Sequence, residues 1–530
     1  MKNTLITSLF VIQAVCVTGQ HDIKWGETME YKKSFGFFYP VSKTDFFAVD
    51  YKKKQTYLQK YSDFKLKNEE EVNFEIEGKK GDIQTLAIIN QKPTYFLSLK
   101  KGKNVSLYSL QYGGNCKNIG GPKKLMEYQP SKKKSKLEDD FHFTFSENGL
   151  FTCAYYDIPG SKEVNNGIGY NIFSSELESF RKGEFEFPFS EEQMEFSYRF
   201  LANNGDYFVL AKIFKDSDRK KNRLVKGQKF VQQIMVFHFS KDGVKQYDIS
   251  PSIKEDIKSS QTDFSCYLNE RDELVVSGIF QVRDREEKDE SLPRGVFIYK
   301  LNTKNKNVIV NSWKFYRDAH ESDEEIFIET KTPKDMLDKR IKPSLQFQFK
   351  VLSCNELDNG DIVGVMQNQY RTTTSRSAGN STITTTRHHF DDLRVFKMNV
   401  QGDLRWVKSI PKRQMEIDVE TGYNSAVSFI KNGKLYLLFN DNLKNYSSSS
   451  GLYHLNKKLY LAESKKTEYS FAEVEMNLTD GEYTRKTLFD FNDHKMFAFP
   501  GKFQINRGSN VMMMIFMQGN NVKHGLLPLN

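Results

Sequence analysis

The chain has 530 residues and a formal net charge of +10, from 78 Lys and Arg against 68 Asp and Glu. An excess this small over so long a chain indicates a well-solvated exterior rather than a surface that attracts anionic surfaces or polymers. Aromatic residues make up 14% of the sequence and only 13 residues are Pro, a composition that favours β-sheet and a large core.

Residues 1–19 have the pattern of a secretory signal peptide. A short start with a positive charge at Lys2 precedes an apolar run over residues 5–17. Short side chains follow that run, so we expect cleavage before Gln20. The run is shorter than the roughly 20 residues of a spanning helix, and Cys16 leaves a lipoprotein as a minor alternative. We therefore predict an exported protein: periplasmic, outer-membrane-associated or on the cell surface.

Four cysteines follow the signal peptide, namely Cys116, Cys153, Cys266 and Cys354. An even count in an exported chain would be typical of disulfides. However, Cys153 lies inside an apolar run, and Cys266 and Cys354 have similar strand-like surroundings. Because buried thiols behave as small hydrophobes, we expect all four to be free.

One unit, a polar turn followed by a short apolar strand, recurs along the chain. Examples are Glu147-Asn148-Gly149 before residues 150–157 and the Asn-Asn-Gly-Asp turn at 203–206 before residues 207–214. Such turns supply the positive φ that tight hairpins need. Further copies have their turns at 269–273, 358–361, 431–433 and 506–510, with a weaker copy at 91–93.

A second, amphipathic hairpin follows each first one and alternates apolar and polar residues around a Gly or Asn turn. These second hairpins begin at Val236, Val296, Leu393 and Phe471, with looser copies at Val105 and Tyr170. Two successive hairpins make the four-stranded antiparallel blade of a β-propeller. A long β-sandwich is the alternative, but it does not explain why a strongly apolar hairpin alternates with an amphipathic one.

Six blades have both hairpins, and the tail from Met496 holds a first hairpin and one further strand. The complete blades lie near residues 83–128, 141–190, 195–250, 262–318, 345–412 and 423–490. Strands around residues 45–66 lack a blade of their own. Joining them to the tail would close the ring without a free edge. We therefore predict an N-terminal linker over 20–35 and one all-β domain over 36–530, a propeller of seven blades, with six or eight as alternatives.

The fifth of these complete blades resembles secreted Gram-negative bacterial β-propeller repeats. Those repeats combine a Gly turn, an apolar strand and a pattern close to V-x-K-x-N-x-x-G-x-x-x-W. Here the turn and strand at 360–365 are followed by the matching segment from Val395 through Lys397 and Gly402 to Trp406. The preceding blade has Trp313 at a different spacing, so the resemblance covers one blade closely and the rest weakly. It implies an envelope or secreted location and a binding role, and it carries no catalytic residues.

Long connections fall at one place in the repeat, between the two hairpins of a blade or between blades. In a four-stranded blade both kinds of connection lie at the same end of the disc, so we expect the binding face there. The loops around Lys220, Glu286, Lys334, Ser377 and Tyr446 should gather on it, and the Ser/Thr tract from Thr372 should be mobile. The candidate binding residues on this face are Lys220, Arg223, Tyr370, His388, His389, Tyr446 and Tyr453.

The sequence contains no G-x-S-x-G, H-E-x-x-H, P-loop, EF-hand or C-x-x-C motif. His388-His389 with Asp391-Asp392 is the nearest approach to a metal cluster, but adjacent residues of an extended segment point to opposite sides. Asn440-Asp441-Asn442 has a single carboxylate and favours an Asx-type turn. We therefore expect no cofactor and no metal.

The predicted function is binding or scaffolding outside the cytoplasm, with envelope proteins or an anionic glycan as partner and no nucleic acid. Contact with a membrane surface would come through a partner. The alternative is a carbohydrate-active enzyme, a glycosidase or lyase, which rests on fold analogy. An enzyme should show several carboxylates beside a deep pocket at the central mouth of the disc, whereas a scaffold should show a flatter patch.

Overall fold

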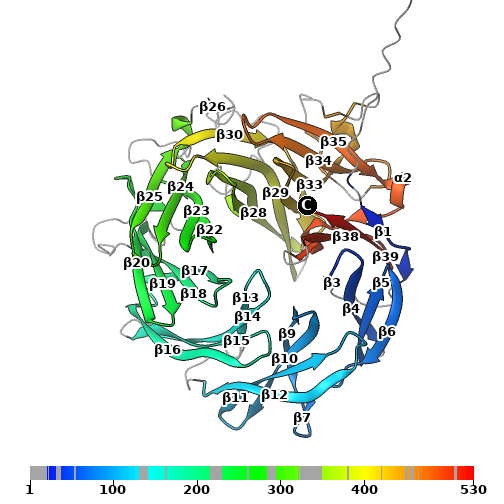
Figure 1. The fold of residues 1–530 in the computed structure, drawn as a ribbon. Coiled ribbons are helices and arrows are strands. Elements are labelled where there is room, and N and C mark those ends of the chain that lie inside the picture. The colour runs from blue at the N-terminus through cyan, green and yellow to red at the C-terminus, as the bar shows by residue number, and fades with distance from the viewer. Residues whose placement is uncertain are drawn as a thin grey trace, which may run out of the picture.

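The structure is a computed structural model, and it shows an all-β ring of sheets around a central axis, a β-propeller (Figure 1). It describes residues 21, 23–30, 38–52, 55–130, 141–160, 164–214, 230–258, 262–282, 294–319, 321–322, 349–378, 381–418, 421–447, 452–453, 459–462, 465–506 and 510–529. Among these residues the strands form eight sheets of four or more strands and one two-stranded sheet.

The first four large sheets follow one another along the chain, each built from consecutive strands. The first two contain β3–β6 (Phe38–Pro40, Asp45–Lys52, Gln55–Ser62, Lys65–Glu71) and β9–β12 (Asp82–Ile89, Lys92–Lys101, Asn104–Tyr112, Asn118–Tyr128), and the small sheet β7–β8 (Glu75–Ile76, Lys79–Lys80) lies between them in the chain. The third contains β13–β16 (His142–Phe145, Phe151–Ile158, Asn165–Ser174, Ser179–Ser190). The fourth contains β17–β20 (Met194–Leu201, Tyr207–Phe214, Phe230–Ser240, Gly243–Ile249), and β21 (Ile257–Lys258) pairs with β19.

The next three large sheets repeat this order. Their strands are β22–β25 (Asp263–Leu268, Glu273–Gln281, Arg294–Asn302, Val308–Phe315), β27–β30 (Phe349–Glu356, Ile362–Ala378, Ser381–Met398, Leu404–Ile410) with β26 (Glu321–Ser322) and β31 (Met415–Ile417) at its margins, and β32–β35 (Ala426–Lys431, Lys434–Asn442, Tyr469–Asn477, Tyr483–Asp490). The short helices are η3 (Tyr316–Asp318), η6 (Leu443–Asn445), α2 (Phe491–His494) and η7 (Pro500–Lys502).

The eighth sheet closes the ring by joining the two ends of the chain. Its C-terminal strands are β36 (Phe497–Ala498), β37 (Gln504–Asn506), β38 (Val511–Gln518) and β39 (Asn521–Pro528). The outer edge of β39 pairs with β1 (Lys24–Trp25) and β2 (Met29–Glu30). Closure by N- and C-terminal strands was predicted, but it uses residues 24–30, where the sequence indicated only a linker.

The predicted use of residues 45–66 to complete the last blade is wrong. These residues form β4 and β5 in a sheet of their own, with β3 inside and β6 outside. The described strands therefore make eight large sheets, one more than the seven expected and equal to the larger of the two alternatives. Phe46 of β4 and Met513 of β38 belong to one apolar cluster, which packs this first sheet against the eighth.

The buried strands explain why the repeat is visible in the sequence. In the first seven sheets the four consecutive strands run in order from the inside of the ring to the outside, with β26 beyond β30 in the sixth (Figure 1). The second strand is covered on both sides, and all eight residues of β18 are buried. The turn between β32 and β33 has positive φ at both Asn432 (51°) and Gly433 (69°), the geometry of a tight hairpin. The core is thus a series of apolar layers between neighbouring sheets.

The predicted free thiols are confirmed, because Cys116, Cys153, Cys266 and Cys354 are all free and buried. Burial raises the pKa of the Cys354 thiol to about 12, which keeps it protonated at neutral pH. Within the described part of the chain, no helix is long and apolar enough to cross a membrane.

His524 of β39 should make the fold sensitive to acid. Its side chain is 0% exposed against Phe38 and Phe46, and burial lowers its pKa to about 3. Below the ordinary His pKa of about 6.5, His524 binds a proton in the unfolded chain but not in the folded chain. The free energy of unfolding therefore falls by about 1.4 kcal/mol for each pH unit of acidification. Lowering the pH from 7 to 5 should therefore reduce the unfolding free energy of the unchanged protein by about 2 kcal/mol more than that of the His524→Leu variant. Urea unfolding at the two pH values measures this difference. The exposed His142 serves as the control position, and equal pH dependence of both proteins would contradict this assignment.

Candidate functional site

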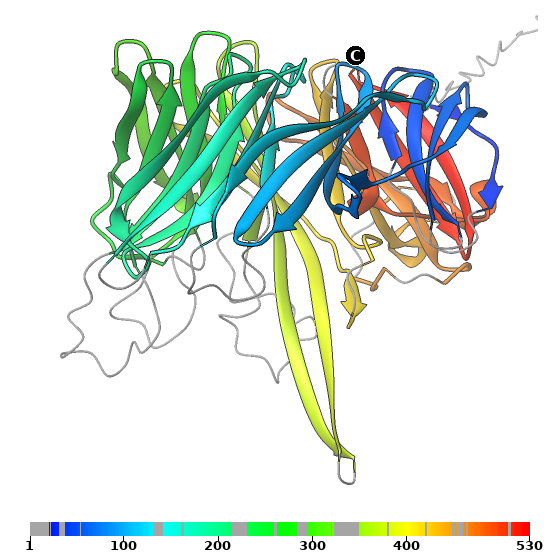
Figure 2. The same ribbon diagram turned by 90° about the horizontal axis from the view of Figure 1, so that it is seen from below.

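A two-stranded ribbon projects from one end of the disc, formed by the outer parts of β28 and β29 (Figure 2). We call residues 369–390 the ribbon. Its pairing runs without interruption from Gln369 opposite Phe390 to Ala378 opposite Ser381. The Ser/Thr tract from Thr372, expected to be mobile, is therefore paired β structure. The physical reason is its content of Thr, a β-branched residue that favours strands.

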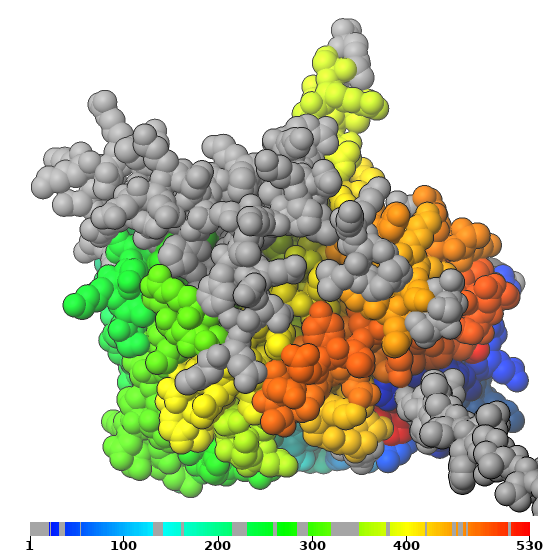
Figure 3. Space-filling model, turned by 90° about the horizontal axis from the view of Figure 1, so that it is seen from above, coloured from blue at the N-terminus to red at the C-terminus, as the bar shows by residue number. Residues whose placement is uncertain are grey.

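The two faces of the ribbon differ in chemistry, because paired residues share a face and successive pairs alternate. The front face carries the pairs Tyr370–His389, Thr372–Arg387, Thr374–Thr385 and Arg376–Ile383, and the back face carries Arg371–His388, Thr373–Thr386, Ser375–Thr384 and Ser377–Thr382. Beyond its first pair, the back face is thus a ladder of hydroxyl groups. Residues 373–377 and 382–384 are exposed, and the ribbon stands clear of the body of the protein (Figure 3).

A β-bulge marks the place where the ribbon leaves the disc. Pairing passes from Gln367–Leu393 to Gln369–Phe390, so that Asn368 faces the two residues Asp391 and Asp392. Bulges bend a strand and redirect its side chains. Here the carboxylates accept hydrogen bonds from backbone: the amide of Lys412 donates to Asp392 (3.0 Å) and that of Gln414 to Asp391 (3.3 Å).

The segment held by this bulge supports the ribbon from the side. It continues into β31, which pairs with β29 at residues 387–389. Lys412 is 1% exposed, and its ammonium donates to the carbonyl of Phe390 (2.5 Å) and the side chain of Gln414 (2.6 Å). This pairing also shows that the connection after a blade and the connection within a blade meet at the same end, as predicted from the repeat.

Burial shapes the electrostatics at the ribbon base. It raises the pKa of Asp391, with a further contribution from the charge of Asp392, and it lowers the pKa of Lys412. The Tyr370 hydroxyl donates to Asp391 (3.0 Å), and its ring stacks on His389 with centroids 4.3 Å apart. The arrangement fixes the ribbon firmly to the disc.

A buried ion pair lies beside this base in the next blade. The Arg485 guanidinium pairs with the Asp441 carboxylate, and both side chains are 1% exposed. The Tyr446 hydroxyl donates to Asp441 (2.5 Å) and accepts from Arg485 Nε (3.0 Å), while the Tyr453 ring lies 4.1 Å from the guanidinium carbon. The buried Arg485 guanidinium is therefore balanced by the Asp441 carboxylate and covered by the Tyr453 ring.

The candidate residues from the sequence divide into three groups. Tyr370, His388 and His389 come together at the ribbon base, with the two histidines on opposite faces. Tyr446 is 6% exposed and its hydroxyl completes the buried ion pair, while the half-buried Tyr453 covers Arg485. Their role in binding a partner stays a prediction. Lys220 and Arg223, and the loops around Glu286 and Lys334, lie outside the described residues.

Two further expectations concern cations. Among the residues described, no group of three or more His, Cys, Asp or Glu could hold a metal ion. The Asn440-Asp441-Asn442 segment contains the predicted Asx-type turn, since the Lys444 amide donates to the Asn442 side chain (3.0 Å). The roles of Lys412, Asp441 and Arg485 could not be predicted, because nothing in the local sequence pattern reveals partners so far apart in the chain.

The opposite end of the disc carries the short hairpin turns and a cavity of about 1060 Å³. The innermost strands β13, β17, β22 and β27 contribute to its lining, which places it at the central mouth. Its lining includes the carboxylates of Glu147, Glu270, Asp272, Glu356 and Asp358. Glu356 is neutralised by the buried Lys300 (3.1 Å) and by Arg271 (2.5 Å).

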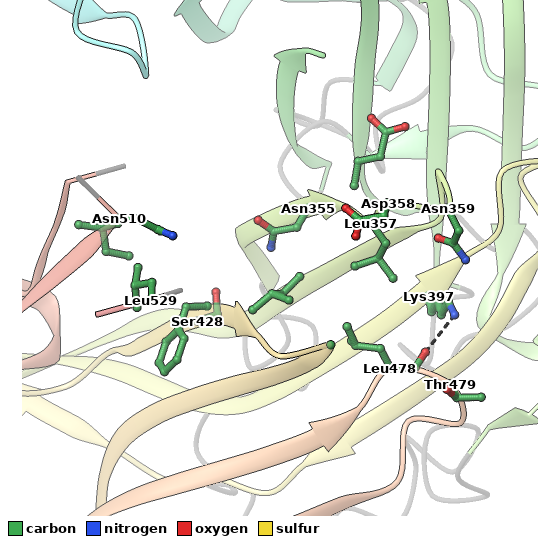
Figure 4. A pocket seen from close by; sticks show the side chains of 15 residues that line it. Asn355, Leu357, Asp358, Asn359, Lys397, Ser428, Leu478, Thr479, Asn510 and Leu529 are labelled. Carbon is green, nitrogen blue, oxygen red and sulfur yellow. Dashed lines mark hydrogen bonds between the residues drawn. The ribbon is translucent and has the colours of Figure 1, made fainter. Parts of the chain in front are cut away.

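A smaller cavity of about 640 Å³ adjoins the same turns (Figure 4). Asn355 and Asp358 lie on one side and Ser428 and Asn510 on the other. Lys397 points along its edge and donates to the carbonyl of Leu478 (2.9 Å). Both cavities therefore lie at the turn end, not at the end where the sequence placed the binding face.

No protein-family model and no curated protein matches the chain. Solved structures with a similar fold include prolyl oligopeptidase B from Galerina marginata (8% identity, TM-score 0.34, 91% of this chain and 55% of that one). Others are the WD40 domain of SCAP from fission yeast (8%, 0.31, 96% and 93%) and the β-propeller domain of the Trilobed protease from Pyrococcus furiosus (10%, 0.31, 87% and 98%). The chain thus spans about half the length of the oligopeptidase, and the likeness concerns the propeller fold alone.

Proposed function

We propose that this chain is an exported propeller that binds or organises a protein partner outside the cytoplasm through its ribbon end. The ribbon carries this proposal. An exposed two-stranded ribbon buries almost no apolar surface and is marginal on its own. Yet the bulge at Asp391 and Asp392, the support from β31 and the buried Lys412 hold it firmly in place. A disc needs none of these features to fold.

Replacing residues 372–386 with a short Gly-Ser link tests the proposal. The disc should keep its unfolding temperature, because most of the deleted side chains are exposed and contribute nothing to the core. Affinity purification from the source cells, followed by mass spectrometry, should recover much less partner. Substitutions in the short turns at Asn204 and Asn432 are the matched controls. Undiminished recovery without the ribbon, together with loss in the turn variants, would place the working face at the turn end.

A carbohydrate-active enzyme is the second candidate, and the acidic turn-end cavity is the observation that favours it. Of its five carboxylates, Glu356 is held by cations in a structural role. Glu270 and Asp358 are exposed at the rim. If this candidate is right, the protein should depolymerise a polysaccharide, and Glu270→Gln or Asp358→Asn should abolish that activity while the ribbon deletion leaves it intact.

A further inference from the structure

We propose that the outer edge of β28 in the ribbon binds an extended, acidic segment of a partner protein by strand addition. This inference rests on the proposed function and specifies the partner's chemistry and the way it docks. Strand addition uses the unpaired N–H and C=O groups of a sheet edge for affinity and the neighbouring side chains for specificity.

The longer open edge of the ribbon lies on β28, because β31 occupies part of the corresponding edge of β29. β28 pairs with β27 only as far as Asn368, which faces the bulge, and with β29 along the whole ribbon. In the described part of the chain, no strand pairs with the other side of β28 from Gln369 to Ala378. The corresponding edge of β29 is occupied at residues 387–389 by β31. An added strand would give the ribbon the third strand that an independent sheet needs.

The charge of the ribbon selects the partner. Residues 371–387 contain Arg371, Arg376 and Arg387 and no acidic residue. Arg371 and Arg376 lie on β28, both are exposed, and they project from opposite faces. A strand paired along this edge would therefore meet one arginine on each face. Opposite charges across strands stabilise a pair and like charges oppose it, so the partner strand should carry two acidic residues at the matching spacing.

Other occupants fit less well. A second copy of this chain would bring arginine edges against each other, and charged side chains on an edge oppose self-pairing. A polysaccharide would need an aromatic platform, but residues 371–387 contain no aromatic residue. The Tyr370 ring at the base is covered by His389 at 4.3 Å. On the back face the Ser375 and Thr384 hydroxyls bond each other at 3.2 Å.

The probe is a fluorescent peptide of about nine residues, the length of an ordinary strand. It alternates Thr and Val, with two Glu residues spaced as Arg371 and Arg376 are. One control peptide has Lys in place of Glu, and another has a central Pro, which removes a ladder donor. Titrated with the full chain, the Glu peptide should bind, and the Arg371→Glu/Arg376→Glu variant should bind it about tenfold more weakly. That variant should prefer the Lys peptide, and the Pro peptide should bind neither protein.

Equal binding of the Glu, Lys and Pro peptides, or no binding of any, would overturn strand addition. A photo-crosslinking residue at Ser375 or at Asn204 in the native cells tests the proposed function separately. A partner captured at Asn204 but not at Ser375 would defeat the proposed function itself. Capture at Ser375 without discrimination among the peptides would defeat only the docking mode. Unchanged thermal unfolding of the double variant excludes a folding defect, since both arginines are exposed.

Discussion

Replacing Asp441 with alanine should lower the free energy of unfolding by about 3–5 kcal/mol, the usual cost of leaving a buried charge without its partner. Among the described residues, the Arg485 guanidinium would keep the Tyr446 hydroxyl and the carbonyl of Pro411 as hydrogen-bond partners, with its side chain 1% exposed. The contact between the guanidinium and the Tyr453 ring would also weaken, because Asp441 would no longer hold the guanidinium in place. Urea unfolding of the purified protein measures the loss.

The matching cycle separates the ion pair from simple loss of packing. Arg485→Met alone should cost a similar amount, whereas Asp441→Ala with Arg485→Met should cost far less than the sum, because neither member of the pair is then left buried without its partner. The exposed pair of Lys123 and Glu178 is the control, and Glu178→Ala should change stability by less than about 1 kcal/mol. Additive costs at Asp441 and Arg485 would show that the two charges do not depend on each other.

The fold could be predicted where both hairpins of a blade carry strong signals. Apolar second strands such as β18 and β33, each preceded by an Asn-Gly type of turn, identified the blades from β9 to β35. The first blade was missed because β3 has only three residues and β6 reads Lys-Leu-Lys-Asn-Glu-Glu-Glu, without apolar alternation. The closing strands β1 and β2 have two residues each, too few for any periodicity.

The candidate site could be predicted only in outline. The repeat correctly indicated that the long connections of blades β27–β30 and β32–β35 meet at one end, and Tyr370, His388 and His389 lie there. Whether a Ser/Thr tract forms a ribbon depends on its partner strand and on the bulge at Asp391, which sequence alone does not locate. The local sequence also does not distinguish an exposed tyrosine from one that covers a buried arginine. The partner of Tyr446 and Tyr453 is Arg485, in a different strand of the blade.

Trp25→Ala should lower the free energy of unfolding by about 3 kcal/mol, toward the lower end for tryptophan truncations because the side chain is half-buried. Trp25 in β1 is opposite Gly525 of β39, and its ring lies 5.2 Å from that of Phe516 and 5.5 Å from that of Phe489. It thereby fixes the outer strand of the sheet that closes the ring.

Loss of this ring should also release β1 and expose the edge of β39, so amide hydrogen exchange at residues 521–528 should accelerate before the rest of the disc exchanges. Lys24→Ala, one position away with an exposed side chain, should change neither quantity. If Trp25→Ala left both the unfolding free energy and the exchange of β39 unchanged, the first and eighth sheets would be held by their direct contacts alone. The apolar cluster that contains Phe46 and Met513 would then be sufficient to close the propeller.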